Sequence, residues 1–329
     1  MNSGDREILV ETQELKVYYS ADGGLLGRNR QTLRAVDGVN LQIKRGELFG
    51  LVGESGSGKS SLARAILGLT PLTYGRIVFR GLELTAANLR GARRHMQMIF
   101  QDPFSSLNPR MTVSEIVAEP LRIQKVGSRQ DQASRVRELM TLVGLSVDSV
   151  QRYPHEFSGG QRQRIGIARA LSTEPDFIVC DEAVSALDVS IQAQIINLLK
   201  NLQERLGLTL LFIAHDLNVV RIVSDQVAVM YLGRVVESGP TAEIFHRAKH
   251  PYTHALLKAI PVADPHIAKA SPRKPLQGEI PSPVSPPSGC TFRTRCPYAT
   301  PLCAEREPIT QKVSHNHFVN CHYWEDLTF

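Results

Sequence analysis

The chain has 329 residues, 42% hydrophobic and 21% charged, a composition typical of a globular protein with a substantial core. A net charge of +6 suits nucleic acid or anionic lipid as a neighbour, but no dense Lys/Arg run with interleaved aromatic residues supports nucleic-acid binding. No apolar run approaches the roughly 18–20 residues that span a bilayer, and the charged N-terminal segment does not resemble a signal peptide. We therefore expect a cytoplasmic protein without a nucleic-acid partner.

The first seventy residues predict strands followed by a helix. Residues 8–19 and 35–53 have the alternating or continuous apolar pattern of strands, and a Gly-containing loop at 21–31 separates them. Residues 58–69 place their apolar side chains on one face, which predicts a helix.

In the middle of the chain, a helical pattern is followed by an alternation of helices and strands. Between about residues 102 and 157 the pattern is helical, without a strand. After it, helices and strands alternate: helix 159–171, strand 176–181, helix 190–207 and strand 208–216. This alternation predicts an α/β domain with a parallel sheet covered on both faces, in which residues 102–157 form an inserted helical subdomain.

The last seventy residues have a different composition. Residues 261–289 are rich in proline, as in an extended linker. Residues 290–329 contain four of the five cysteines. We expect three parts: a domain over residues 1–260, the linker over 261–289, and a small extension over 290–329.

A phosphate-binding loop is the strongest single motif. The segment "GESGSGKS", Gly53–Ser60, matches G-x-x-x-x-G-K-[ST] between a predicted strand and a predicted helix. Small residues let backbone N–H groups surround a phosphate, and the helix N-terminus adds positive potential. Lys59 would reach the β- and γ-phosphates, and Ser60 would bind Mg²⁺. The predicted nucleotide-binding residues of this segment are Gly53, Glu54, Ser55, Gly56, Ser57, Gly58, Lys59, Ser60 and Ser61.

An acidic pair completes the requirements of an ATPase. Asp181 and Glu182 end the predicted buried strand of "FIVCDE". Asp181 is the candidate Mg²⁺ partner, and Glu182 is the candidate general base that polarises water. Between these motifs, "FSGGQ" predicts a second anion-binding helix start. One triphosphate needs only one phosphate-binding loop. We therefore expect this second helix start to contact a nucleotide held by another subunit rather than to be a simple helix cap.

Five ordered motifs together resemble the ATP-binding cassette (ABC) ATPases. They are Gly53–Ser60, Gln101 in "IFQDP", "FSGGQ", "VCDEAVSALD" and "IAHD", and the resemblance covers roughly residues 8–260. It implies a RecA-like P-loop core with an N-terminal antiparallel β-subdomain, an inserted helical subdomain, and ATP and Mg²⁺ as ligands. The motif "DEA" stands where "DEP" is commoner, which leaves both carboxylates in place.

The same resemblance implies roles for further residues. Catalysis would involve Glu182, with Gln101 sensing Mg²⁺ and His215 touching the γ-phosphate. Two ATPs would lie in a head-to-tail dimer, with the communicating loop of each subunit at Asp188. An aromatic residue near the N-terminus would stack on adenine; we choose Tyr19, with Tyr18 as its rival. The residues that would bind the γ-phosphate held by the other subunit are Ser158, Gly160 and Gln161.

Longer segments resemble one subgroup, the ATPase subunits of bacterial oligopeptide and dipeptide importers, which also contains nickel and glutathione importers. The similar segments include "QMIFQDPFSSLNPRMTVSEIVAEPL", "HPYTHALLKAIP" and "GEIPSPVSPPSGCTFRTRCPYATPLC". The resemblance implies two membrane permease subunits, a second homologous ATPase forming a heterodimer, an extracytoplasmic peptide-binding protein, and a place on the cytoplasmic face of the inner membrane. The alternative is a soluble ABC ATPase without a transport role, such as an iron–sulfur assembly ATPase.

The clustered cysteines predict a metal centre. Cys290, Cys296, Cys303 and Cys321 follow the linker, whereas Cys180 belongs to the predicted core. Disulfides are improbable in a reducing cytoplasm, and a small segment gains stability from a metal. The gaps exceed those of zinc knuckles, and some members of the resembled group carry a 4Fe–4S cluster here, so we expect that cluster, with zinc second and no part in hydrolysis. Three histidines could substitute as ligands, but we expect solvated or capping roles for them: His315, His317 and His322.

Overall fold

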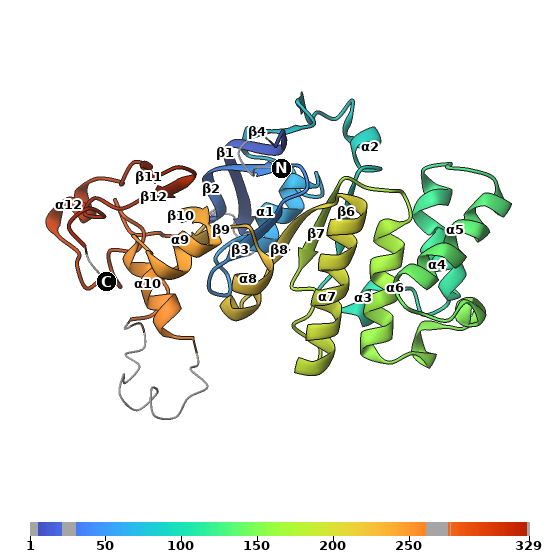
Figure 1. Ribbon diagram of the computed structural model, residues 1–329. Coiled ribbons are helices and arrows are strands. Elements are labelled where there is room, and N and C mark those ends of the chain that lie inside the picture. Colours follow the sequence, from blue (N-terminus) through green and yellow to red (C-terminus); the bar gives the residue numbers. More distant parts are fainter. Residues whose placement is uncertain (1–5, 22–30, 261–275, 277, 328–329) are drawn as a thin grey trace, which may run out of the picture. The chain divides into compact units, whose positions relative to one another are not determined.

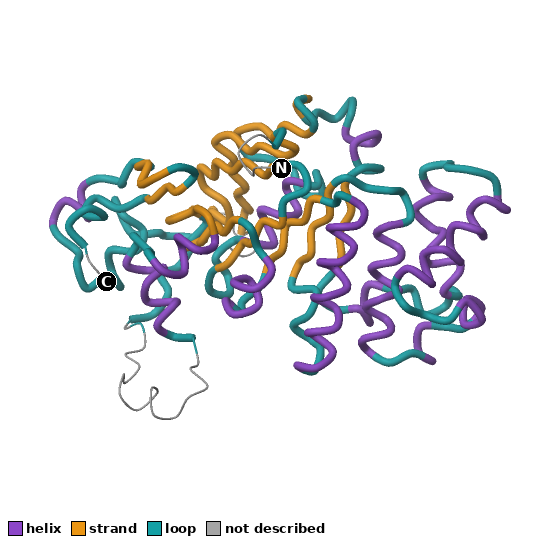
Figure 2. The backbone as a smooth tube through the Cα atoms, in the orientation of Figure 1, coloured by secondary structure: helices purple, strands orange, loops and turns teal. Residues whose placement is uncertain are grey.

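The computed structural model describes residues 6–21, 31–260, 276 and 278–327 (Figures 1 and 2). Most of the expected linker over 261–289 therefore lies outside the described residues. The chain forms two compact units, each assembled from separate stretches of sequence. The first unit contains Met1–Val10, Ile43–Leu48 and Val78–Ile213, and the second contains Glu11–Gln42, Phe49–Ile77 and Ala214–Phe329.

The first unit is built on three parallel strands. They are β6 (Met96–Ile99), β7 (Phe177–Asp181) and β8 (Thr209–Ile213), with β7 in the middle. Every residue of β7 and β8 is buried, which explains why both read as continuous apolar runs. The register places Ile99 beside Cys180 and Asp181 beside Ile213. The expected parallel α/β strands are confirmed.

Helices make up the rest of this unit. The long ones are α4 (Val113–Ile123), α5 (Arg129–Leu142), α6 (Gly159–Leu171) and α7 (Val189–Leu206). Helices α4 and α5 each begin at a capping box, formed by Thr112 with Glu115 and by Ser128 with Asp131. Helix α4 packs on both α5 and α6, next to one another in Figure 1. The shorter elements are β5 (Leu82–Glu83), α2 (Leu89–Ala92), α3 (Pro103–Ser106) and the 3₁₀ turns Val147–Gln151 and Pro154–Glu156.

The second unit carries strand β3 (Leu48–Val52), which leads into α1 (Lys59–Ile66). Strand β9 (Gln226–Tyr231) pairs with β3 in parallel, and β10 (Arg234–Pro240) pairs with β9 antiparallel. Two strands of the C-terminal extension continue this sheet: β12 (His317–Val319) pairs with β10, and β11 (Gln311–Ser314) pairs with β12. The extension therefore belongs to the same sheet as the strand that precedes the phosphate loop.

The N-terminal strands lie in a separate sheet. Strands β1 (Ile8–Ala21) and β2 (Gln31–Lys44) are neighbours in it, and the Thr12 hydroxyl of β1 donates to the Val39 carbonyl of β2 at 3.1 Å. The other elements are β4 (Tyr74–Phe79), α8 (Leu217–Val223), α9 (Thr241–His246), α10 (Pro251–Lys258) and α12 (Pro301–Glu305).

An aromatic side chain of the extension is buried against β9 and α10. Phe292 is 1% exposed, and its ring centroid lies 5.3 Å from those of Tyr231 in β9 and Tyr252 in α10. Tyr231 and Tyr252 are themselves 4.7 Å apart. Large aromatic side chains contribute strongly to packing, so this contact fixes the extension on β9 and α10.

None of the helices in these described ranges combines the length and hydrophobicity that a bilayer crossing requires.

Candidate nucleotide-binding and hydrolysis residues

The phosphate loop forms a closed turn between β3 and α1 in the second unit. The Lys59 ammonium is 5% exposed and donates to the carbonyls of Gly53 at 2.8 Å and Glu54 at 2.9 Å. The loop closes with the Ser57 N–H donating to the Glu54 carbonyl at 3.1 Å. A lysine in the first turn of a helix, inside a ring of backbone groups, is the arrangement that the motif predicts for binding phosphate.

Two glycines of this loop cannot carry a side chain. Gly53 has φ 153°, and a Cβ there would overlap the carbonyl oxygen of Met230. Gly58 has φ 104°, and a Cβ there would overlap the carbonyl oxygen of Ala35. Positive φ favours glycine, and the close approach of neighbouring backbone excludes every other residue. The sequence motif therefore has a steric cause at both glycines.

Three of the predicted Mg²⁺-binding and hydrolytic residues lie in the first unit, at or just after the ends of β6 and β7: Gln101, Asp181 and Glu182. Asp181 is 6% exposed, and Glu182 directly follows the strand with φ 47°, in the left-handed region. The Gln101 side-chain amide donates to the Glu182 carboxylate at 2.8 Å, and the Glu182 N–H donates to the Ile213 carbonyl at 3.0 Å. A glutamate with positive φ is strained, and such strain concentrates at functional positions. The structure thus brings Gln101 and Glu182 together, as their predicted roles require.

The "FSGGQ" segment, predicted to be a second anion-binding helix start, forms a helix cap in the single chain. The Ser158 hydroxyl accepts from the Gln161 N–H at 3.3 Å, and the Gln161 side chain accepts from the Ser158 N–H at 3.0 Å, a capping box at the start of α6. A Cβ on Gly160 would lie 2.5 Å from the Ile191 side chain of α7. Capping and helix packing thus account locally for Ser158, Gln161 and Gly160, and their contact with a second subunit's nucleotide stays a prediction. Asp188 is the N-cap residue of α7, without a side-chain cap bond.

The two candidate adenine-stacking tyrosines face different surroundings in β1. The Tyr18 hydroxyl donates to Asp37 at 2.5 Å, and burial, together with this bond to Asp37, raises the pKa of Tyr18 to about 12. Tyr19 is 38% exposed. Because successive strand residues point to opposite faces, only one of these rings can serve a ligand on a given face. The exposed ring of Tyr19 fits stacking better.

His215, just after the end of β8, is also exposed.

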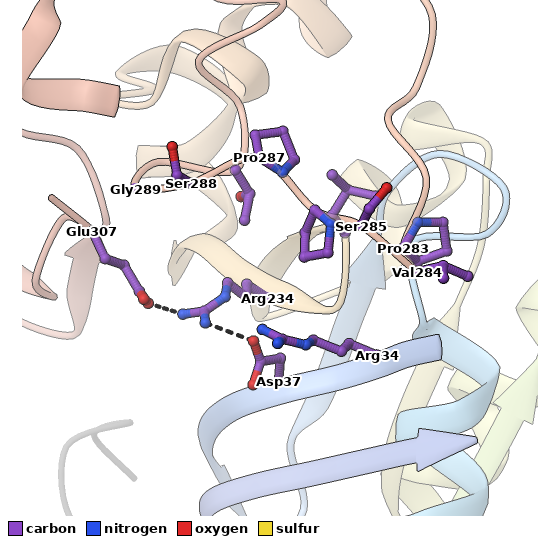
Figure 3. A pocket seen from close by; sticks show the side chains of 13 residues that line it. Arg34, Asp37, Arg234, Pro283, Val284, Ser285, Pro287, Ser288, Gly289 and Glu307 are labelled. Atoms are coloured by element: carbon purple, nitrogen blue, oxygen red, sulfur yellow. Dashed lines mark hydrogen bonds and ion pairs between the residues drawn. The ribbon is translucent and has the colours of Figure 1, made fainter. Parts of the chain in front are cut away.

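Asp37 joins the core to the extension. Arg234 of β10 donates to Asp37 at 2.6 Å and also pairs with Glu307 of the extension (Figure 3). Burial raises the pKa of Asp37, but hydrogen bonds from Tyr18 and Arg234 outweigh it and lower that pKa below its usual value. These residues line a polar pocket whose other wall is the proline-containing segment 283–287 (Figure 3).

The four extension cysteines line one small pocket. Cys290, Cys296, Cys303 and Cys321 surround it together with Phe292 and His322. All five cysteines of the chain are free thiols. Burial raises the pKa of Cys296 and that of Cys321 to about 11. Among the residues that the structure describes, no three His, Cys, Asp or Glu side chains are placed to hold a single metal ion.

Each sulfur in this pocket has a hydrogen-bonding neighbour. The N–H two residues further along donates to the sulfur in three cases, from Phe292 to Cys290, from Tyr298 to Cys296 and from Tyr323 to Cys321. The Thr300 hydroxyl lies 3.8 Å from the sulfur of Cys303. Such bonds stabilise thiolates and tune the sulfur ligands of a cluster. Four thiols with such bonds are the kind of donor set that an iron–sulfur cluster uses, although no three of the described side chains are placed to hold a single metal ion.

The histidines near the cysteines have structural roles. His317 is fully buried in β12 and its Nε2 lies 2.8 Å from Glu237 of β10, so our expectation of a solvated or capping histidine is wrong there. His322 lines the cysteine pocket and its Nε2 lies 3.0 Å from the Arg306 carbonyl.

Sequence reasoning missed two residues that touch the phosphate loop. Arg295 forms a bidentate pair with the Glu54 carboxylate at 2.6 and 3.0 Å. The Tyr252 hydroxyl accepts from the Glu54 N–H at 3.0 Å. Both lie about two hundred residues or more from the loop in sequence. The neighbouring similar segments "HPYTHALL" and "CTFRTRC" were the only signal that pointed to them.

Comparison with known proteins identifies the class to which this architecture belongs. Residues 36–185 match the family described as ABC transporter, and residues 236–303 match the family described as the C-terminal region of oligopeptide/dipeptide transporters. The chain belongs to the ABC transporter ATPases, a family that hydrolyses ATP, and its fold is the α/β cassette of that family.

The relatives that it resembles are peptide-transport ATPases. It is 53% identical over 322 residues to the oligopeptide transport ATP-binding protein OppF of Salmonella typhimurium, covering 96% of each chain. It is 52% identical to the putative oligopeptide transport ATP-binding protein YkfD of Bacillus subtilis, covering 97% of this chain and 96% of the relative.

Two solved structures share the cassette. One is the dimeric post-hydrolysis state of the ATP-binding cassette MJ0796 bound to ADP and Pi, with a TM-score of 0.62 at 30% identity, covering 71% of this chain and 99% of the other. The second is cbiO1 of Clostridium perfringens, part of the ABC transporter complex cbiONQ, with a TM-score of 0.64 at 28% identity, covering 73% of this chain and 92% of the other.

Proposed function

We propose that this protein is the ATP-hydrolysing subunit of a bacterial importer for oligopeptides or dipeptides. The observation that carries the proposal is the continuous similarity to OppF, which includes the C-terminal region as well as the cassette. A soluble ABC ATPase of the iron–sulfur assembly type would not be expected to share the proline-rich segment and the extension. Nickel and glutathione remain the alternative substrates within the same importer class.

In the proposed reaction, the phosphate loop binds ATP through its backbone N–H groups and Lys59. Mg²⁺ would be held by Ser60 and Asp181, with Gln101 close to it. Glu182 would orient and polarise the attacking water, and His215 would contact the γ-phosphate. The hydrogen bond from Gln101 to Glu182 supports this assignment, because it ties the proposed Mg²⁺ sensor to the proposed base.

The proposed active form is a head-to-tail dimer with a second, homologous ATPase. Ser158, Gly160 and Gln161 would contact ATP bound to the partner's phosphate loop, and Asp188 would lie in the loop between the two sites. The structure of MJ0796 bound to ADP and Pi is dimeric, which supports a dimer of cassettes. Tyr19 would stack on adenine.

We also propose a place for the subunit on the cytoplasmic face of the inner membrane, attached to two permease subunits that receive peptide from an extracytoplasmic binding protein. The helical subdomain, about residues 102–157, would contact the permeases. Phe104, 63% exposed in α3, is the contact residue that we propose within this subdomain. The proposed division of the chain remains an ATPase domain over 1–260, a linker over 261–289 and the extension over 290–329.

Purification from detergent-solubilised membranes tests this proposal. An affinity-tagged chain expressed from its own operon should co-purify with two hydrophobic subunits and a second cassette ATPase, all identifiable by mass spectrometry. Recovery of the chain without any membrane subunit, in company with soluble iron–sulfur assembly proteins, would support the alternative class. A Phe104→Asp variant should lose the permeases while keeping its affinity for ATP, whereas Leu82→Asp, at another exposed apolar residue (67% exposed), should keep them.

We further propose that Cys290, Cys296, Cys303 and Cys321 hold a 4Fe–4S cluster. The hydrogen bonds to all four sulfurs support a cluster. Zinc is the second choice, because the gaps between the four cysteines exceed those of zinc knuckles. When bound, the cluster would stabilise the fold of the extension by cross-linking its cysteines, or would supply a redox-sensitive group.

A further inference from the structure

The phosphate loop contains a carboxylate that opposes its own function. Glu54 is the second residue of the loop, next to Gly53. A negative charge beside a triphosphate site repels the ligand, and the repulsion is strong where water is partly excluded. Glu54 is only 24% exposed in its side chain, so solvent screens it incompletely.

The charge on Glu54 is neutralised from the C-terminal extension. Both guanidinium NH2 groups of Arg295 donate to the two oxygens of Glu54, at 2.6 and 3.0 Å. The Arg295 side chain is 4% exposed, and the carboxylate of Glu54 raises the pKa of Arg295 further above its usual value. A buried bidentate pair is a strong and directional contact that a lysine reproduces poorly.

The position of Arg295 depends on the cysteine-bearing turn. Its N–H donates to the Phe292 carbonyl at 3.0 Å, and its neighbour in sequence is Cys296. Phe292 packs against Tyr252, whose hydroxyl accepts from the Glu54 N–H at 3.0 Å. The extension therefore contacts the Glu54 side chain directly through Arg295, and it packs through Phe292 on Tyr252, the residue that binds the Glu54 N–H.

We propose that Arg295 is a positioning residue for ATP binding: it neutralises Glu54 and holds the phosphate loop in shape, so that the nucleotide affinity of the ATPase depends on the C-terminal extension. This differs from our expectation, based on distance in sequence, that the extension takes no part in the hydrolytic site. The proposal rests on the proposed role of the phosphate loop in binding ATP.

A double-mutant cycle on the full-length chain tests the proposal. The affinity for a fluorescent ATP analogue with Mg²⁺ is measured for the wild type, Arg295→Met, Glu54→Gln and the double variant. Arg295→Met should raise Kd roughly 10-fold, because the carboxylate is left uncompensated beside the phosphates. The double variant should recover most of the loss, because the repelling charge is absent. Arg295→Lys should fall between the wild type and Arg295→Met.

Three further readouts separate positioning from a merely structural role. In steady-state hydrolysis, Arg295→Met should raise KM and leave kcat near the wild-type value. Its defect in Kd should shrink as salt screens the uncompensated charge. Arg306→Met, which removes an exposed arginine from the same extension, should keep the wild-type Kd.

The outcomes distinguish this inference from the proposed function. Lys59→Ala should abolish binding of the analogue; if it does not, the proposed phosphate site itself is wrong. If Lys59→Ala abolishes binding but Arg295→Met keeps the wild-type Kd, the inference alone is overturned. An equal defect in Arg295→Met and the double variant, with a lowered melting temperature in both, would also overturn it, because Arg295 would then be needed for folding only.

Discussion

The Gln101 amide donates a 2.8 Å hydrogen bond to the Glu182 carboxylate, so the proposed Mg²⁺ sensor and the proposed base already contact one another in the single chain. Glu182→Gln keeps the size of the side chain but removes the group that polarises water. We expect the hydrolysis rate to fall by about 10²–10⁴-fold while ATP binding persists.

A matched control is available for this variant. Glu174 also has positive φ, 53°, but it precedes strand β7 instead of following it, and its side chain is exposed. Glu174→Gln should keep normal turnover in a phosphate-release assay. Near-normal turnover of Glu182→Gln would show that another residue is the base.

The proposed head-to-tail dimer predicts that two variants of this one subunit disable different sites. In the assembled transporter, vanadate trapping of a photoreactive ATP analogue reports which subunit holds the nucleotide. Lys59→Ala should abolish labelling of this chain, whereas Ser158→Arg should abolish labelling of the partner ATPase. Loss of the same label in both variants would contradict the head-to-tail arrangement.

A pH-dependent stability is expected from His250, the buried N-cap of α10. Burial lowers the pKa of His250 to about 4, against an ordinary value of 6.5, and its Nδ1 accepts from the Tyr252 N–H at 3.0 Å. Since the unfolded state binds the proton first, stability is fully present above about pH 6.5 and falls as the pH drops towards 4, by up to about 3 kcal/mol.

Thermal unfolding at pH 7 and pH 5 checks this prediction. His250→Asn keeps a capping acceptor but does not titrate, so its melting temperature should change less between the two pH values. His155→Asn, at an exposed histidine, should retain the wild-type dependence. An unchanged dependence in His250→Asn would assign the effect to other groups.

Two glycines of α6 offer a matched test of helix packing. A Cβ on Gly160 would lie 2.5 Å from Ile191, whereas nothing lies within 4 Å of one on Gly166. Gly160→Ala should therefore lower the free energy of unfolding by about 1–3 kcal/mol, and Gly166→Ala should raise it by up to about 1 kcal/mol. Urea unfolding followed by circular dichroism measures both, and equal effects would contradict the described packing of α6 on α7.

The cysteine pocket predicts a coloured protein. Anaerobically purified chain should be brown and contain about four irons and four sulfides per chain. Cys296→Ala should remove the colour and the iron, whereas Cys180→Ala, in the buried strand β7, should keep them. One stoichiometric zinc in colourless anaerobic protein would overturn the iron–sulfur proposal and retain a four-cysteine site; no metal would overturn both.

The sequence was informative wherever a motif is local. The phosphate loop, the strand before Asp181 and the long helices have periodic or fixed-spacing signals, because their residues are neighbours in the chain.

The contacts that the sequence did not reveal join distant segments. Arg295 with Glu54 and His317 with Glu237 pair side chains 241 and 80 residues apart, and no spacing rule marks them. The pairing of β12 with β10 depends on backbone hydrogen bonds. The composition of a three-residue strand does not predict such pairing. These long-range contacts explain why the sequence predicts a separate extension, whereas the structure includes the extension in the second unit.

Uptake of a labelled oligopeptide into proteoliposomes that contain the purified complex tests the central claim most directly. The account predicts accumulation that requires both enclosed ATP and the peptide-binding protein, and that is lost when this subunit carries Glu182→Gln. Accumulation of nickel or glutathione in place of peptide, or peptide uptake that is unaffected by Glu182→Gln, would contradict it.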